Sequence, residues 1–221
     1  MDIDLSPITE NWRFLLGGLG ITLLLSVLTL AGSAVSGTSL ALGRLYGPAW
    51  MRWPIVFYID SMRAVPVLVV LVWVYFAVPI LTGIAAPPFW AALVALVMQL
   101  AAYVAEAVRA GIESIRPGQV RAGLALGMSR AQILRTILLP QALVRMLPAF
   151  GSILSITIKD TAIATVIAVP ELMKRAETVA GQSYRPIEVY TVVILAYFLI
   201  LFPSTRAVDV LYKRVAHLGR S

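Results

Sequence analysis

Three consecutive polar residues, Lys159, Asp160 and Thr161, stand inside an apolar run that extends from about 146 to 169. If this run is a helix that rises about 1.5 Å per residue, Lys159 lies about 21 Å from Arg145 along the axis. A charge at the centre of a membrane-spanning helix costs about 2.5–3.5 kcal/mol on insertion scales. These side chains therefore need a cavity, an ionic partner or a second subunit.

The three residues have two interpretations. Consecutive helical side chains point about 100° apart, so Lys159 and Asp160 cannot fully satisfy each other. We predict a substrate pocket in which Lys159, with Arg63 as a helper, attracts a carboxylate, while Asp160 and Thr161 line or brace the same cavity. The alternative is that Asp160 pairs with a basic residue of another span and only stabilises the fold.

A second pair of charges, Glu106 and Arg109, has the i,i+3 spacing of helical neighbours. Such residues lie on one face of a helix, where opposite charges attract. We expect an ion pair that orients the end of a membrane span.

The chain lacks patterns for catalysis. None of its lysines, Lys159, Lys174 and Lys213, follows a glycine, which excludes the phosphate-binding pattern G-x-x-x-x-G-K-[ST]. Cysteine is absent, and the single histidine, His217, lies in a basic tail. We therefore expect a chain that is not an enzyme and holds no metal or cofactor of its own.

The composition is that of a membrane protein. Hydrophobic residues make up 60% of the chain, and the mean hydropathy is +0.88, whereas an ordinary soluble domain is about 45–50% apolar. The net charge is +7, but the arginines are spread over the loops between apolar runs. This spread indicates orientation in a membrane and argues against nucleic acid as a partner.

The apolar runs predict an all-α integral membrane domain over residues 1–221 with five transmembrane helices. The acidic start and the arginine-rich loop before Arg145 place the N-terminus outside and the C-terminus inside. Pro66 should kink the second span because it lacks an N–H, and residues 170–186 should form a short helix at the outer surface. The expected spans are residues 14–42, 55–80, 89–110, 146–169 and 187–209.

The polar stretch 113–140 separates the third and fourth spans. Gly127 is expected to end one short helix in the left-handed conformation, and Ser129 with Gln132 has the form of a capping box that starts another. Pro140 disfavours helical geometry in Leu139 and should end this second helix. The prediction is a cytoplasmic elbow of helix, glycine and helix.

The spacing of Ala122, Gly127 and the run from Ile137 to Pro140 resembles the EAA loop of ABC importer permeases, which docks into a groove of the ATPase subunit. The chain also resembles the polar amino acid permeases of the glutamate, glutamine and histidine type from about Leu15 to Tyr212. The motifs that carry this resemblance are Arg63 to Pro66, Ala102 to Glu106, Arg109 to Ile112, Gly118-Gln119, Pro140 to Ala142, Leu147-Pro148, Lys159 to Thr161 and Glu171-Leu172.

The resemblance implies a type I importer fold in the bacterial cytoplasmic membrane. Arg121 departs from the family, because it stands where the glutamate of the EAA loop is usual. The residues implied in ATPase coupling are Arg121, Ala122, Gly123, Gly127, Met128, Ser129 and Pro140.

The implied partners are an ATP-binding cassette ATPase dimer, a second permease subunit and an extracytoplasmic binding protein that delivers a polar amino acid. The second subunit is either a copy of this chain or a paralogue. The pattern around residues 57–79 resembles permeases for acidic amino acids most closely.

Two other classes of function remain open. In a stand-alone secondary carrier, Lys159 and Asp160 would relay an ion or a proton. Such carriers are built from internal repeats, and no repeat is evident. A structural membrane subunit would leave the buried charges unexplained.

Overall fold

The computed structural model describes residues 4–216, so His217 lies outside the described part of the chain. These residues are helical throughout and include no strand. The α-helices are α1 (Ser6–Tyr46), α2 (Ala49–Ala64), α3 (Val67–Val72), α4 (Val78–Thr82), α5 (Pro88–Glu113), α6 (Pro117–Ala125), α7 (Arg130–Ile133), α8 (Leu139–Asp160), α9 (Leu172–Ser183) and α10 (Pro186–Val215). Two π-helical turns, Trp73–Ala77 and Leu134–Leu138, and one 3-10 helix, Thr161–Ile167, connect some of them.

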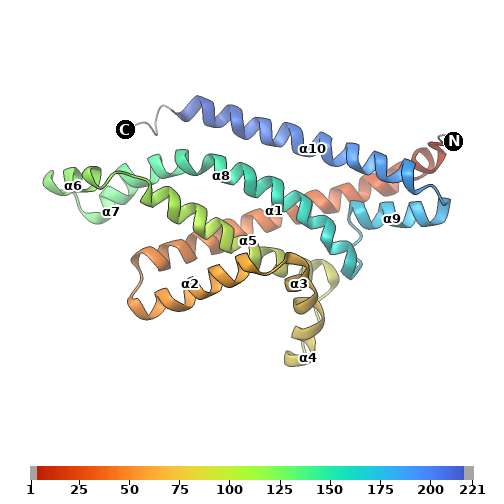
Figure 1. Cartoon of the computed structure of the whole chain (residues 1–221), viewed down its shortest axis with the longest axis horizontal. Coiled ribbons are helices and arrows are strands. Elements are labelled where there is room, and N and C mark those ends of the chain that lie inside the picture. Colours follow the sequence, from red (N-terminus) through yellow and green to blue (C-terminus); the bar gives the residue numbers. More distant parts are fainter. Residues whose placement is uncertain (1–3, 217–221) are drawn as a thin grey trace.

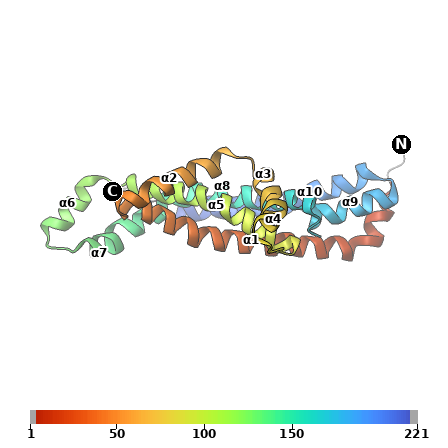
Figure 2. The same ribbon diagram turned by 90° about the horizontal axis from the view of Figure 1, so that it is seen from below.

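The long helices α1, α5, α8 and α10 run along the long axis of the molecule (Figure 1). The short helices α6 and α7 lie at one end, and α9 lies at the other end beside the start of α1 (Figure 2). Four helices of the described chain are long and apolar enough to cross a membrane. They are Ser6–Tyr46, Pro88–Glu113, Arg130–Ile167 and Pro186–Val215.

The expected second span is broken at Pro66. The segments Ala49–Ala64 and Val67–Thr82 meet at an angle of 109° and make a fifth span only if the bent pair is counted as one. Val65 has extended backbone angles, φ −87° and ψ 135°, as expected for a residue that precedes proline. The predicted kink is therefore confirmed. The segments α3 and α4 form an arm that packs against α5 at α3 and projects from the bundle at α4 (Figure 1).

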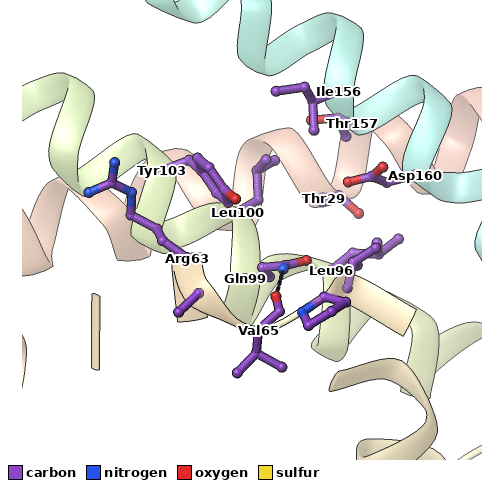
Figure 3. A pocket seen from close by; sticks show the side chains of 13 residues that line it. Thr29, Arg63, Val65, Leu96, Gln99, Leu100, Tyr103, Ile156, Thr157 and Asp160 are labelled. Carbon is purple, nitrogen blue, oxygen red and sulfur yellow. Dashed lines mark hydrogen bonds between the residues drawn. The ribbon is translucent and has the colours of Figure 1, made fainter. Parts of the chain in front are cut away.

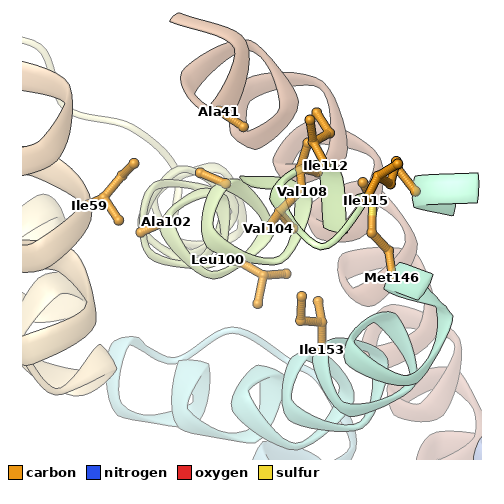
Figure 4. Packing of buried hydrophobic residues seen from close by; sticks show 12 residues of the cluster. Ala41, Ile59, Leu100, Ala102, Val104, Val108, Ile112, Ile115, Met146 and Ile153 are labelled. Carbon is orange, nitrogen blue, oxygen red and sulfur yellow. The ribbon is translucent and has the colours of Figure 1, made fainter. Parts of the chain in front are cut away.

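Helix α5 is the centre of the core (Figure 4). Ala102 and Ala105 are fully buried on it, and α1, α2 and α8 all pack against it. A Cβ atom at Gly37 of α1 would lie 2.6 Å from the carbonyl oxygen of Ala101. The two backbones thus approach more closely than any larger residue at Gly37 would allow.

The predicted helix end at Leu139 is wrong. Leu139 has helical angles, φ −60° and ψ −47°, and the helix continues through Pro140 into α8. A π-helical turn, Leu134–Leu138, precedes the proline. We attribute the continuity to this turn, because its extra residue relieves the clash of the proline ring with the preceding turn. The second helix of the elbow and the fourth span are thus one continuous helix.

The helix expected within residues 170–186 is confirmed as α9. Its N-cap, Glu171, is fully buried and accepts hydrogen bonds from the N–H groups of Met173 (2.9 Å) and Lys174 (2.7 Å). The hydroxyls of Thr22 in α1 (3.3 Å) and Tyr197 in α10 (3.4 Å) donate to the same carboxylate. One side chain thereby joins three helices at this end of the molecule.

Candidate functional site

A cavity of about 290 Å³ lies where the break at Pro66 faces α1, α5 and α8. Figure 3 shows its lining. Of the four residues predicted for a substrate pocket, Asp160 and Arg63 line this cavity, whereas Lys159 and Thr161 do not. The full lining is Thr29, Arg63, Ala64, Val65, Pro66, Val67, Leu96, Gln99, Leu100, Tyr103, Ile156, Thr157 and Asp160.

Asp160 ends α8 and supplies the carboxylate of the cavity. Asp160 lies in the continuous apolar helix Arg130–Ile167, which is long enough to cross a membrane. The ion pairs found among the described residues do not include Asp160. A structural ion pair between Asp160 and another span is therefore not observed within the described part of this chain.

The neighbours of Asp160 point elsewhere. Lys159 is exposed on the surface of α8. Thr161 is completely buried and donates its hydroxyl to the carbonyl oxygen of Ile158 at 2.8 Å. The different directions of Lys159 and Asp160 agree with the helical geometry expected from the sequence.

Arg63 lies at the rim of the cavity. Its guanidinium carbon is 5.9 Å from the centroid of the Tyr103 ring, a cation–π distance. Figure 3 shows the guanidinium on the far side of Tyr103 from Asp160. The two opposite charges therefore stand at different sides of the site.

Gln99 of α5 is a cavity residue that the sequence reasoning missed. Its side-chain nitrogen donates to the carbonyl oxygens of Val65 (2.7 Å) and Met62 (3.3 Å) at the end of α2. Gln99 is only 7% exposed. A glutamine in the middle of an apolar span was the available signal, because a buried amide at membrane depth needs partners.

Thr29 of α1 is a second missed residue. It is buried, and its hydroxyl oxygen has no hydrogen-bond partner among the described residues. A helical threonine commonly donates to the carbonyl four residues earlier, as Thr157 does to Ile153 at 2.8 Å. The oxygen itself is enclosed, so a ligand in the cavity would reach this hydroxyl only if the wall moved slightly.

The cavity has polar groups that can bind a ligand. Apart from Arg63 at the rim, the polar lining consists of the Asp160 carboxylate, the Gln99 amide and the hydroxyls of Thr29, Tyr103 and Thr157, all of which can accept a hydrogen bond. The described residues include no group of three or more His, Cys, Asp or Glu residues that could hold a metal ion. An ammonium group is the ligand that this set of acceptors favours.

The elbow has the local geometry that the sequence predicts. Gly127 has φ +75°, the left-handed conformation expected at a helix end. The Ser129 N–H donates to the side chain of Gln132 at 2.8 Å, and the Gln132 N–H donates to the Ser129 hydroxyl at 3.3 Å. This completes the predicted capping box.

Most residues predicted to contact an ATPase are accessible. Gly123 is buried, and a Cβ atom there would lie 2.9 Å from the side chain of Ile133, so the two short helices approach closely at this glycine. Met128 is partly buried. The exposed residues of the predicted set are Arg121, Ala122, Gly127, Ser129 and Pro140.

A network of charges lies at the end of α5 that leads to the elbow. Glu106 forms ion pairs with Arg109 on the same helix and with Arg44 of α1, the latter at 3.0 Å. Arg109 also pairs with Glu113. The network joins the ends of α1 and α5 beside the elbow.

Comparison with known proteins identifies the chain. Residues 33–217 match the family described as "Binding-protein-dependent transport system inner membrane component". The chain belongs to this family. It is therefore a permease, and its apolar helices are those of a multi-pass protein of the inner membrane.

The relatives of this permease agree in length. It is 35% identical over 208 residues to the probable amino-acid ABC transporter permease protein YckA of Bacillus subtilis (strain 168), covering 94% of this chain and 92% of YckA. It is 36% identical over 201 residues to the glutamine transport system permease protein GlnP of Escherichia coli (strain K12), covering 90% of this chain and 92% of GlnP.

A solved structure of an amino acid ABC transporter with histidines has the same fold. Its TM-score is 0.90 at 30% identity, and the alignment covers 97% of the permease and 100% of that chain. These matches confirm the resemblance to amino acid permeases and do not favour a stand-alone carrier.

Proposed function

We propose that this permease is the translocation subunit of an ABC importer for a polar amino acid. Its relatives and the matching solved structure support the class of transporter. The observation that carries the substrate assignment is the cavity whose lining includes the Asp160 carboxylate, the Gln99 amide and Thr29. A zwitterionic amino acid supplies the ammonium group that these acceptors lack.

In this proposal Asp160 and Lys159 bind opposite ends of the amino acid. The α-ammonium group lies in the cavity against Asp160 and Thr29. Lys159 is exposed on the same end of α8, so it would face the path between two permease subunits and attract the α-carboxylate. Thr161 would brace Asp160 through its hydrogen bond to Ile158.

The side chain of the substrate would then lie near Gln99, Tyr103 and Arg63. An uncharged amide fits the first two groups, and one relative is named for glutamine transport. An acidic side chain, the expectation from the sequence, would require Arg63 to leave the Tyr103 ring and turn into the cavity. We therefore propose a polar uncharged amino acid, with acidic amino acids as the competitors to test.

The proposed partners follow from the transporter class. The elbow from Pro117 to Leu138 would dock on one subunit of an ATPase dimer on the cytoplasmic side, with the N-terminus of the permease outside. A binding protein would deliver the amino acid at the end near α9. ATP and Mg²⁺ would be bound by the ATPase, and a second permease subunit would complete the path.

The test is to purify the permease with its associated proteins and measure ATP hydrolysis with a panel of amino acids. Asp160→Asn should raise the concentration for half-maximal stimulation about 10- to 100-fold, because a hydrogen bond to a charged group contributes about 1.5–3 kcal/mol. Asp209→Asn is the matched control, since Asp209 is exposed on α10 and forms only a long ion pair with Arg206 (3.9 Å). Equal stimulation of the wild type and Asp160→Asn by the same amino acid would refute the proposed site.

A further inference from the structure

Met62 and Val65 are two of the residues whose carbonyl oxygens lose their backbone donor at the break in the second span. In a continuous helix the N–H of residue 66 would donate to Met62, but Pro66 has no N–H. The N–H of Val69 donates to Pro66 at 3.0 Å instead of to Val65. The side-chain nitrogen of Gln99 donates to both carbonyls, at 3.3 Å for Met62 and 2.7 Å for Val65.

One amide thus supplies hydrogen bonds to two of the carbonyl oxygens at the break. A glutamine side chain offers two N–H donors and one acceptor oxygen, and both donors are directed to α2. Figure 3 shows the amide oxygen on the side of the cavity where Thr29 lies. Gln99 is therefore shared between the break and the cavity.

We propose that Gln99 is a positioning residue that sets the angle between α2 and the arm α3–α4, and that its amide oxygen contacts the amino acid in the cavity. The backbone from Ala64 to Val67 forms one wall of that cavity, so the angle of the arm decides the shape of the site. A ligand that donates to the amide oxygen holds the amide in the orientation that serves the break. The contact with the amino acid rests on the proposed function, whereas the hydrogen bonds to α2 do not.

Packing holds the start of the arm but not its tip. Val70, Leu71 and Val74 are buried in a cluster with residues of α1 and α5. Ile80 and Leu81 at its end are 85% and 72% exposed, so packing within this chain does not fix the position of the tip. Buried carbonyl groups without a donor are unfavourable. Without Gln99, the chain should therefore change the angle at Pro66 until water or another donor reaches Met62 and Val65.

The angle can be measured with spin labels, because the chain contains no cysteine. Asp60→Cys on α2 and Ile80→Cys on α4 place labels on the two sides of the break, and both positions are exposed. In the assembled transporter without amino acid, we expect one narrow distance distribution. Gln99→Leu should broaden or shift it.

Two further variants separate hydrogen bonding from packing. Gln99→Glu keeps the size and the acceptor but replaces the two donors with carboxylate oxygens, so we expect the same broadening as in Gln99→Leu. Met98→Leu is the matched control, because Met98 is the neighbour of Gln99 on α5 and packs against the apolar cluster that includes Leu71 and Leu96. A wild-type distribution in both Gln99 variants would overturn the positioning role.

The contact with the amino acid has its own measurement. We expect Gln99→Leu to raise the concentration for half-maximal stimulation of ATP hydrolysis about tenfold. An unchanged concentration would overturn the contact. A broadened distribution together with stimulation that is insensitive to Asp160→Asn would refute the proposed substrate site but leave the positioning role intact.

A suppressor keeps the proposal testable if Gln99→Leu does not assemble. Pro66→Ala restores an N–H that can donate to Met62. The double variant Gln99→Leu with Pro66→Ala should therefore recover assembly and have a narrow distance distribution between the two spin labels. Failure of Pro66→Ala to rescue assembly would count against the role of these hydrogen bonds.

Discussion

At the scale of single residues, a substitution of Thr29 should affect ligand binding and protein stability differently. A buried hydroxyl without a partner destabilises the empty protein, so Thr29→Val should leave thermal stability unchanged or raise it. The same substitution removes a group that the amino acid would contact. We expect the concentration for half-maximal stimulation to rise about 2- to 10-fold, from the roughly 0.5–1.5 kcal/mol of a neutral hydrogen bond.

The control for this prediction is Thr191→Val on α10, where the threonine is exposed and donates to Ile187 at 2.7 Å. It should change neither quantity. A Thr29→Val protein with lower stability and unchanged stimulation would mean that Thr29 serves only packing.

The residues of the site differ in how far the sequence could predict them. The charges of Lys159 and Asp160 stand out in an apolar run, so their need for a cavity or a partner follows from their cost in a membrane. Thr29 and Gln99 are candidate site residues because the fold places the break at Pro66 beside α1 and α5, which the sequence does not predict. A hydroxyl or amide in a span has many ordinary partners, and its sequence neighbours do not reveal which of them are absent.

At the scale of elements, Gly127 tests whether the elbow must hold one conformation. A Cβ atom at Gly127 would meet nothing within 4 Å, so a substitution there acts only through the positive φ. Valine should strain the turn by about 1–3 kcal/mol and misdirect the helix that continues into α8. Gly127→Val should therefore insert normally, with ATP hydrolysis no longer stimulated by the amino acid.

Gly118→Val is a matched control, because a Cβ atom at Gly118 also meets nothing within 4 Å and its φ is not positive. We expect it to retain stimulated hydrolysis. Normal transport and ATPase association in Gly127→Val would mean that the turn has no part in coupling.

Another element-level prediction concerns the junction of α1, α9 and α10 at Glu171. Burial raises the pKa of this carboxyl above its ordinary value of 4.5, although hydrogen bonds from Met173, Lys174 and Thr22 act in the opposite direction. The folded protein thus binds a proton more tightly than the unfolded chain. The associated stability is fully present below pH 4.5 and is lost as the pH rises through the raised pKa.

The measurement is the melting temperature of the transporter in detergent as a function of pH. The wild type should lose stability as the pH rises above about 4.5, and Glu171→Gln, which stays neutral, should lack this component of the slope. Identical slopes in the two proteins would show that Glu171 does not change its protonation on unfolding.

The elements also show where local sequence signals are sufficient. Gly127 and the Ser129–Gln132 pair act within one turn, and both have the predicted geometry. The two prolines differ in outcome. The kink predicted at Pro66 is confirmed as a break of 109°, whereas Pro140 does not end its helix as predicted. A π-helical turn precedes Pro140, and Gln99 supplies hydrogen-bond donors at the break beside Pro66. Neither feature can be predicted from the residues next to the proline.

At the scale of the whole molecule, the two ends of the helical bundle are built from different elements and differ in charge. The elbow at one end is basic, and α9 with the start of α1 forms the other end (Figure 1). An interior of small residues on α5 holds the long helices together between them. The overall helical class follows from composition, but the departure of the arm from the bundle depends on contacts between helices distant in the sequence.

This polarity predicts the orientation in the membrane. Single cysteines at Ala85, between α4 and α5, and at Gly181 of α9 should react with an impermeant thiol reagent applied to intact cells. A cysteine at Ala125 of the elbow should react only after the membrane is opened, because arginine-rich loops remain on the cytoplasmic side. All three positions are exposed in this chain, so a difference in labelling would report the side of the membrane rather than burial within the permease. Labelling of Ala125→Cys in intact cells would contradict the orientation, and with it the contact between the elbow and a cytoplasmic ATPase.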